Sequence, residues 1–372
     1  MKFPSALIAA FALALALALA AGPALAKDPD RRLVLVTVDG LGWQEVFRGA
    51  DPARAADKTF VEDPAALKAR FVEISDRPRA LTPFLHDVVA RQGVLLGNRD
   101  QGGCAAVTND MWFSYPGYNE ILTGRVDPAI TSNEHGPNRN VTVLEWLNER
   151  PEFRGKVRAI TSWNVFDDIL AAARSKLPVN AGWATPASRT PMEATLARLQ
   201  DQTPRRWAGV RFDVFTHAYA LEALRHDKPR VLFVSYGETD DFAHDGLYDQ
   251  TLIAARRTDG FLGELWAALQ ADPAYAGKTT LIVTTDHGRG SDGRADAWKS
   301  HGKPQWPGSD QTWIAAIGPD IAPQAASAAT CAGANQLAAT GLQALGLDWK
   351  DFDLAAGAPL AIFTAKGRVS QP

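Results

Sequence analysis

The sequence predicts an α/β protein with a mostly parallel central sheet and helices on both faces. Short apolar, β-branched runs alternate with longer amphipathic segments along the chain, an order typical of strand–helix–strand units. The runs are continuous rather than alternating with polar residues, which indicates strands buried on both faces of a sheet. No internal repeat or low-complexity linker divides the chain, so we expect a single domain over residues 27–372.

The predicted elements follow in chain order. Strands are expected at residues 33–38, 157–161, 231–236 and 280–285, and amphipathic helices at 143–148, 212–225 and 247–270. The stretch 182–207 is rich in Thr, Pro and Arg and lacks a clear core pattern. We expect it to form a surface excursion or a lid.

Residues 1–26 have the pattern of a signal peptide. Lys2 supplies a positive start, residues 6–21 are an unbroken apolar run, and Gly-Pro at 22–23 ends that run. Ala-Leu-Ala at 24–26 has the small-x-small form that signal peptidases cleave. An uncleaved membrane anchor is the alternative, because the run approaches the length that spans a bilayer. With cleavage, we expect an exported protein, periplasmic or secreted, without a membrane span.

Composition excludes several classes of protein. Hydrophobic residues make up 46% of the 372 residues, which is too many for a disordered chain. The net charge is −3, with 39 basic and 42 acidic residues, so nothing predicts a nucleic-acid-binding module. Export would place Cys104 and Cys331 in an oxidising compartment, where a disulfide can form. Sequence alone leaves that pairing open.

Aspartates follow three of the four predicted strands. Asp39 and Asp286 come directly after their strands, and Asp240 follows its strand by four residues. In open α/β sheets the ligand crevice lies beyond the carboxyl ends of the strands, so these acids are expected to converge. Each one alone is compatible with a helix N-cap or a turn. Together they predict a site.

Histidines accompany two of these acids. His244 lies four residues after Asp240, His287 is adjacent to Asp286, and His301 follows in a Gly-containing loop. Mixed Asp and His ligands suit Zn²⁺ or a similar first-row divalent ion. Six such side chains exceed the needs of one tetrahedral ion, so we expect two ions. Structural or surface roles are expected for His86, His217 and His226.

Ser114, in the segment FSYPGYN, is the candidate nucleophile. Pro116 suits the first turn of a helix, which would place Ser114 just before the helix begins. Backbone N–H groups and the helix dipole favour an anion there. An isolated Ser in this context is an N-cap. Beside two metal ions, it is expected to attack a phosphoryl group.

These residues resemble the alkaline phosphatase superfamily, and within it the nucleotide pyrophosphatase/phosphodiesterase (type I phosphodiesterase) branch. The resemblance runs in order from Asp39 to His301 and includes the nucleophile between the first and second metal positions. It implies an alkaline phosphatase-like fold and two Zn²⁺ ions, with Mn²⁺ as another suitable ion. One set would be Asp240, His244 and His301, and the other Asp39, Asp286 and His287 with Ser114 completing the shell. Asn140, shortly after His135-Gly136, would bind a phosphoryl oxygen.

The resemblance also implies the reaction: hydrolysis of a small phosphorylated substrate through a phosphoserine intermediate. Gly117-Tyr118 stand where sulfatases carry an Arg, which disfavours a sulfatase. Residues 162–166 lack the Lys and Arg of some monoesterases, so we expect phosphodiester or nucleotide pyrophosphate substrates. A phosphomonoesterase is the main alternative. Asp241 could compete with Asp240 as a ligand, but only Asp240 has the correct spacing to His244.

Two further classes stay open. A phosphosugar mutase would share the fold and a similar pair of metals, although mutases of this group are usually cytoplasmic. A non-catalytic binding module would keep the fold alone, although the complete set of ligands and Ser114 argues against it.

Overall fold

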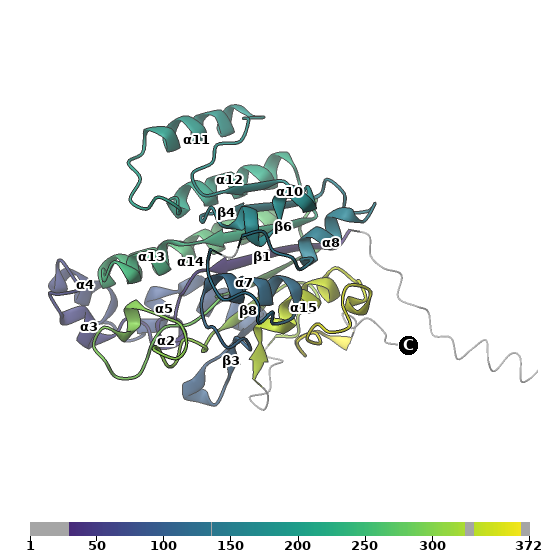
Figure 1. Ribbon diagram of the computed structural model, residues 1–372. Coiled ribbons are helices and arrows are strands. Elements are labelled where there is room, and N and C mark those ends of the chain that lie inside the picture. Colours follow the sequence, from purple (N-terminus) through teal and green to yellow (C-terminus); the bar gives the residue numbers. More distant parts are fainter. Residues whose placement is uncertain (1–29, 135, 324–330, 366–372) are drawn as a thin grey trace, which may run out of the picture.

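The computed structural model describes residues 30–134, 136–323 and 331–365. The expected signal peptide at residues 1–26 lies outside these ranges. A seven-stranded sheet forms the centre of the molecule (Figure 1). Its strands, in spatial order, are β2 (Val94–Leu96), β8 (Ile314–Ile317), β7 (Thr279–Thr284), β1 (Arg32–Val38), β6 (Val231–Tyr236), β4 (Val157–Thr161) and β5 (Val179–Ala181).

The sheet is mostly parallel, as predicted. Only β8 runs against its neighbours, pairing antiparallel with both β7 and β2. The expected strands at 157–161 and 231–236 have the predicted bounds. The strand expected at 33–38 begins one residue earlier, and the one expected at 280–285 begins and ends one residue earlier.

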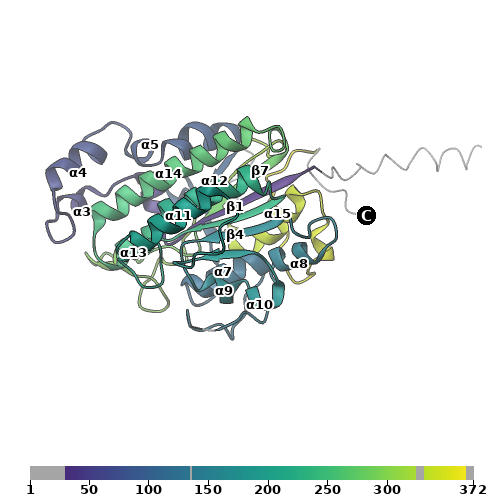
Figure 2. The ribbon, with the colours of Figure 1, turned by 90° about the horizontal axis from the view of Figure 1, so that it is seen from above.

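Helices cover both faces of the sheet. Successive residues of β1 show the two cores, because Val34 and Val36 pack on one face while Leu33 and Leu35 pack on the other. The first face carries α2 (Trp43–Arg48), α5 (Arg77–Leu81), α12 (Asp213–His226) and α14 (Tyr248–Ala271). The second carries α7 (Ser114–Thr123), α8 (Val143–Glu149), α9 (Phe166–Ile169) and α15 (Leu337–Ala344). Figure 2 shows α12 and α14 lying over the strands.

Shorter elements connect these layers. They are α3 (Pro52–Ala56), α4 (Pro64–Phe71), α6 (Ala90–Gln92), α10 (Ala172–Ser175), α11 (Pro191–Gln202) and α13 (Glu238–His244), with the π-helical turn η1 (Leu85–Val89) and the 3₁₀ turns η2 (Arg99–Gln101), η3 (Ala297–Lys299), η4 (Ala334–Gln336) and η5 (Trp349–Asp351). Strands β3 (Ala105–Ala106) and β9 (Ala332–Gly333) form a separate parallel pair. No helix within the described residues has both the length and the apolar character to cross a bilayer.

The stretch 182–207 contains helix α11, which packs beside α12 (Figures 1 and 2). Two hydrogen bonds close the stretch: the Trp183 indole donates to the carbonyl of Trp207, and Gln200 donates to the carbonyl of Trp183. The segment is therefore anchored at its base by its own side chains.

Cys104 and Cys331 form a disulfide, with 4.5 Å between their Cα atoms. The bond lies beside the β3–β9 pair and links positions 227 residues apart. Such a long covalent loop stabilises a fold mainly by restricting the unfolded chain. The pairing that the sequence left open is thus formed.

Candidate active site

The carboxyl ends of three adjacent strands carry the predicted acids. In the order β7–β1–β6, Asp39 follows β1 directly, Asp286 follows β7 by two residues, and Asp240 lies in α13 just beyond β6. The structure gathers them with the three histidines into two groups. One consists of Asp39, Asp286 and His287, and the other of Asp240, His244 and His301.

The first group is buried and centred on the imidazole of His287. Its Nε2 lies 3.4 Å from Oδ1 of Asp39 and 3.4 Å from Oδ2 of Asp286. Its Nδ1 lies 2.9 Å from the carbonyl of Gly288. A carbonyl only accepts hydrogen bonds, so Nδ1 carries a proton, and Nε2, which faces the two carboxylates, is the nitrogen that could bind a cation.

Each carboxylate of this group has one oxygen held by the protein and one left for a cation. Tyr118 donates its hydroxyl to Oδ2 of Asp39 (2.8 Å), and the backbone N–H of Gly40 donates to Oδ1 of Asp286 (3.1 Å). The other oxygens, Oδ1 of Asp39 and Oδ2 of Asp286, are buried without a hydrogen-bond partner among the described residues. Buried unpaired carboxylate oxygens are costly, and a divalent cation beside Nε2 of His287 would satisfy both. The donor set therefore fits a metal ion.

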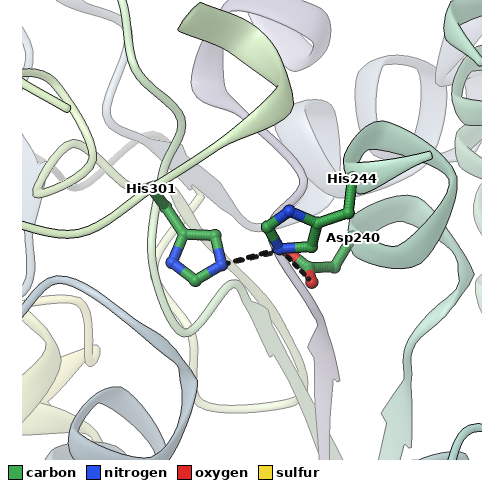
Figure 3. A group of neighbouring side chains, drawn as sticks. All are labelled: Asp240, His244 and His301. Carbon is green, nitrogen blue, oxygen red and sulfur yellow. Dashed lines mark hydrogen bonds and ion pairs between the residues drawn. The ribbon is translucent and has the colours of Figure 1, made fainter. Parts of the chain in front are cut away.

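The second group lies closer to the surface, and its side chains point toward one another (Figure 3). Nε2 of His244 lies 3.0 Å from Nε2 of His301 and 3.1 Å from Oδ2 of Asp240. Asp240 and His244 share one face of α13 because they are four residues apart, and His301 reaches them from the loop after η3. Two imidazole nitrogens and a carboxylate around one point suit zinc.

Negative charge is concentrated around the first group. Burial and the neighbouring Asp240 raise the pKa of Asp39, and burial together with Asp39 raises the pKa of Asp286 well above its usual range. Burial disfavours protonated His287, but the carboxylates, Asp286 foremost, outweigh burial and raise its pKa to about 9. When the pKa values of neighbouring carboxyl groups and of an imidazole are all raised, the site carries excess negative charge. Such a site favours cations.

Ser114 faces the buried group. Its Oγ lies 3.3 Å from Nε2 of His287, and the residue is 4% exposed. Helix α7 begins at Ser114 itself, with Phe113 at the N-cap, one residue earlier than the sequence predicted. The hydroxyl thus lies at the amino end of a helix and beside the metal ligands.

The loop before Ser114 is fixed by buried polar contacts. The carboxylate of Glu120 accepts hydrogen bonds from the backbone N–H groups of Thr108 and Asn109 and from both of their side chains. Asn109 in turn accepts from the N–H groups of Met111 and Trp112. Trp112 has a φ of 59°, a left-handed conformation that a bulky residue adopts only when its surroundings impose it. These contacts set where α7, and therefore Ser114, begins.

A cavity of about 360 Å³ opens onto both groups. The residues that line it are Asp39, Ser114, Asn133, Trp163, Val210, Gly237, Asp240, Asp241, His244 and His301. None of these described lining residues is a Lys or an Arg. Trp163 and Val210 supply an apolar part of the wall, opposite in character to the ligands.

The structure does not bring Asn140 to this cavity. Its side-chain amide donates to Oδ1 of Asn119 (3.0 Å) and to Oδ2 of Asp127 (2.8 Å), so both of its donors are engaged elsewhere. Asn133 lines the cavity instead, and its Oδ1 accepts from the N–H of Tyr115 (2.9 Å). Because Oδ1 makes that contact, the amide NH2 group of Asn133 is the part of the side chain that could donate a hydrogen bond to a ligand.

The adjacent acid Asp241 is not part of either ligand group but lines the cavity. Burial and the charge of Asp240 raise the pKa of Asp241 to about 9. The choice of Asp240 over Asp241 on spacing thus agrees with the placement of the two side chains.

The remaining described histidines lie outside both groups. His86 contacts the carbonyl of Val46 (2.8 Å), buried His217 contacts the hydroxyl of Tyr236 (3.0 Å), and exposed His226 contacts Asp227 (3.0 Å). His135 lies outside the described residues.

Sequence reasoning missed Asn133 and Tyr118. Tyr118 carried a usable signal, because it lies four residues after Ser114 and so on the same face of a helix. Asn133 carried none, because it lies in a loop without periodicity.

Comparison with known proteins agrees with this arrangement. The family model described as type I phosphodiesterase/nucleotide pyrophosphatase matches residues 98–303, which is more than half of the chain. Among curated proteins, a 2,3-bisphosphoglycerate-independent phosphoglycerate mutase from Nitrosococcus oceani is 38% identical over 68 residues, covering 18% of this chain and only 12% of the mutase.

Two solved structures share the fold. A protein in the alkaline phosphatase superfamily from Vibrio parahaemolyticus has a TM-score of 0.50 at 15% identity, covering 87% of this chain and 68% of that one. The C-terminal periplasmic domain of EcEptC from Escherichia coli, in complex with Zn, has a TM-score of 0.52 at 12% identity, covering 90% and 88%. The chain belongs to the type I phosphodiesterase/nucleotide pyrophosphatase family.

Proposed function

We propose that this protein is an exported two-zinc hydrolase of phosphodiesters or nucleotide pyrophosphates that works through a phosphoserine at Ser114. The observation that carries the proposal is the position of the Ser114 hydroxyl, 3.3 Å from Nε2 of His287 and on the same cavity as the second ligand group. A nucleophile beside one cation site, with a second cation site on the same cavity, suits in-line phosphoryl transfer.

The two ligand groups and Ser114 have separate roles in the proposed reaction. Asp39, Asp286 and His287 would hold one zinc ion beside Ser114, and Asp240, His244 and His301 would hold the other. Zinc supplies Lewis acidity, which lowers the pKa of a nearby hydroxyl and offsets the charge that develops on phosphoryl oxygens. The Ser114 hydroxyl loses its proton to solvent, and its oxygen forms a bond to phosphorus as the bond to the leaving oxygen breaks. Water then attacks the same phosphorus and releases Ser114.

Asn133 replaces Asn140 in this proposal as the side chain that holds a phosphoryl oxygen. Asn133 lines the cavity. Its Oδ1 accepts from the N–H of Tyr115, so its amide NH2 group is the donor for a phosphoryl oxygen. Preorganised donors of this kind stabilise a transition state because they need no rearrangement as charge develops.

Three features of the cavity favour diesters over monoesters. A monoester dianion is best received by extra cations, yet no Lys or Arg is among the described residues that line the cavity. The wall instead carries the carboxyl group of Asp241, which supplies no positive charge to receive a dianion. Trp163 and Val210 offer apolar surface to an organic substituent, of which a diester carries two and a monoester only one.

Export is supported by the Cys104–Cys331 disulfide, because such bonds persist in oxidising compartments. If residues 1–26 are a cleaved signal, Edman sequencing of protein recovered outside the cytoplasm would begin at Lys27. A chain that retains Met1 would contradict cleavage.

A hydrolysis panel with purified, zinc-loaded protein tests the activity. It compares a bis-aryl phosphate diester, an aryl monoester, a nucleotide pyrophosphate and an aryl sulfate. We expect kcat/KM to be higher for the diester or pyrophosphate than for the monoester, and no turnover of the sulfate. Faster monoester hydrolysis would favour the phosphomonoesterase alternative, and isomerisation of a phosphosugar without phosphate release would indicate a mutase.

A further inference from the structure

One buried arginine connects the chain segments that carry both ligand groups. Arg289, which is 5% exposed, donates from Nε to the carbonyl of Gly40 (2.9 Å) and from Nη1 to the carbonyl of Lys299 (3.4 Å). Its Nη2 forms an ion pair with Oδ1 of Asp240. All three contacts use the planar fork that distinguishes Arg from Lys.

Each partner of Arg289 adjoins a ligand. Gly40 follows Asp39, Lys299 lies two residues before His301, and Asp240 is itself a member of the second group. Arg289 itself lies two residues after His287. A single guanidinium group therefore fixes the relative positions of segments from four separate parts of the sequence.

The backbone at Gly40 is shaped around this contact. Gly40 has a φ of 57°, which favours glycine. A Cβ atom at this position would lie 2.5 Å from Nη2 of Arg289 and 2.5 Å from Oδ1 of Asp240. The ion pair thus occupies the space that any other residue at position 40 would need.

We propose that Arg289 is a positioning residue that assembles the second zinc site. By binding Oδ1 of Asp240, it directs Oδ2 toward Nε2 of His244, which lies 3.1 Å away. Arg289 is not among the residues that line the cavity, so it acts through Asp240 rather than on the substrate. Partners that orient metal ligands typically change metal affinity by 10–100-fold when removed. This inference rests on the proposed two-zinc function.

Zinc binding to Arg289→Lys provides the test, measured on the folded protein by competition with a chromophoric chelator. The variant keeps a positive charge but cannot make the three separate contacts of the guanidinium group. We expect one of the two zinc ions to bind about 10–100-fold more weakly while the other is retained. The matched control is Arg211→Lys, because Arg211 is fully buried and bonded to Asn180 and Thr216, away from the ligands. It should lose stability but bind both ions normally.

Gly40→Ala is the second variant, because it displaces the ion pair while leaving Arg289 in the sequence. It should weaken the same zinc ion, and it also disturbs the first group, because the Gly40 N–H holds Oδ1 of Asp286. Two tightly bound zinc ions in folded Arg289→Lys would overturn the proposal, as would equal zinc loss in Arg211→Lys. If both Arg289→Lys and Gly40→Ala failed to fold while Arg211→Lys folded, Arg289 would be a folding determinant, and the proposal would be wrong. Wild-type protein that binds no zinc would instead contradict the proposed function.

Discussion

The hydroxyl oxygen of Ser114 lies 3.3 Å from Nε2 of His287, across 173 residues of sequence. The contact joins the first residue of α7 to the loop that follows β7, so it depends on how two faces of the sheet are assembled. It places a hydroxyl at the point where two buried carboxylate oxygens lack a partner. The candidate nucleophile and a ligand of the first group are therefore in direct contact.

Removal of metal should abolish hydrolysis. Purified mature protein is expected to carry about two zinc equivalents, and exhaustive chelation should remove activity that zinc restores, because ligand-bound metal is part of the folded site. His301→Ala should lose one equivalent, measured by elemental analysis. His226→Ala, which changes an exposed side chain outside both groups, is the control. Undiminished turnover after chelation would contradict the metal assignment.

The two adjacent acids should behave differently. Asp240→Asn removes a ligand and should lower kcat/KM by about 100-fold or more and reduce zinc content. Asp241→Asn removes a group that only lines the cavity, so it should retain both ions and lose less than about tenfold in kcat/KM on a diester. Steady-state kinetics with parallel zinc determination separates them. Equal damage from both substitutions would refute the choice of Asp240.

Substitutions of Asn133 and Asn140 should have different effects on kcat and on stability. Asn133→Ala should lower kcat by about 100-fold, because it removes a donor to the transition state, and should cost less stability than Asn140→Ala, because it breaks only the bond from the Tyr115 N–H. Asn140→Ala breaks two buried hydrogen bonds and should cost about 1–3 kcal/mol in the free energy of unfolding. Its kcat should stay within a few-fold of wild type. The reverse pattern in urea unfolding and kinetics would restore the role that the sequence assigned to Asn140.

Asp259 should make stability depend on pH. Its carboxylate accepts from the N–H groups of Phe84 and Leu85, and burial raises its pKa to about 6. Because the folded-state pKa exceeds the unfolded value, the folded protein binds the proton more tightly. The stabilisation is therefore present at low pH and lost as pH rises through about 6.

Comparison with Asp259→Asn, which does not titrate, isolates this effect. Between pH 5 and pH 7.5 the wild-type free energy of unfolding should fall by about 1 kcal/mol relative to the variant. Urea denaturation at both pH values measures the difference. A constant gap between the two proteins would mean that Asp259 has an ordinary pKa in the fold.

Much of the fold was predictable because its long strands are buried on both faces. The runs at 33–38, 157–161, 231–236 and 280–285 read as continuous apolar segments, and the structure places them within one residue of those bounds. The short strands β2, β5 and β8 were missed, because three or four residues are too few to show a pattern. The disulfide could not be predicted, because spacing alone does not show whether the two cysteines lie close enough to bond.

The site divides in a similar way. Aspartates at strand ends were visible because the ends of parallel strands share one edge, so their convergence follows from topology. Asn140 was assigned from the family resemblance, by its position shortly after His135-Gly136, and in the structure its amide is hydrogen-bonded to Asn119 and Asp127. Arg289 carried no signal either, since its partners come together only when β1, α13 and the loop after η3 are folded.

Trapping of the covalent intermediate tests the central claim most directly. Wild-type protein is mixed with a diester under single-turnover conditions, quenched at low pH, digested and examined by peptide mass spectrometry. We expect phosphate on the peptide that contains Ser114. Ser114→Ala should fold and bind zinc fully, with turnover lower by about three orders of magnitude. Ser114→Thr should keep partial activity, because it keeps the hydroxyl. An unmodified Ser114 peptide together with an active Ser114→Ala would contradict it.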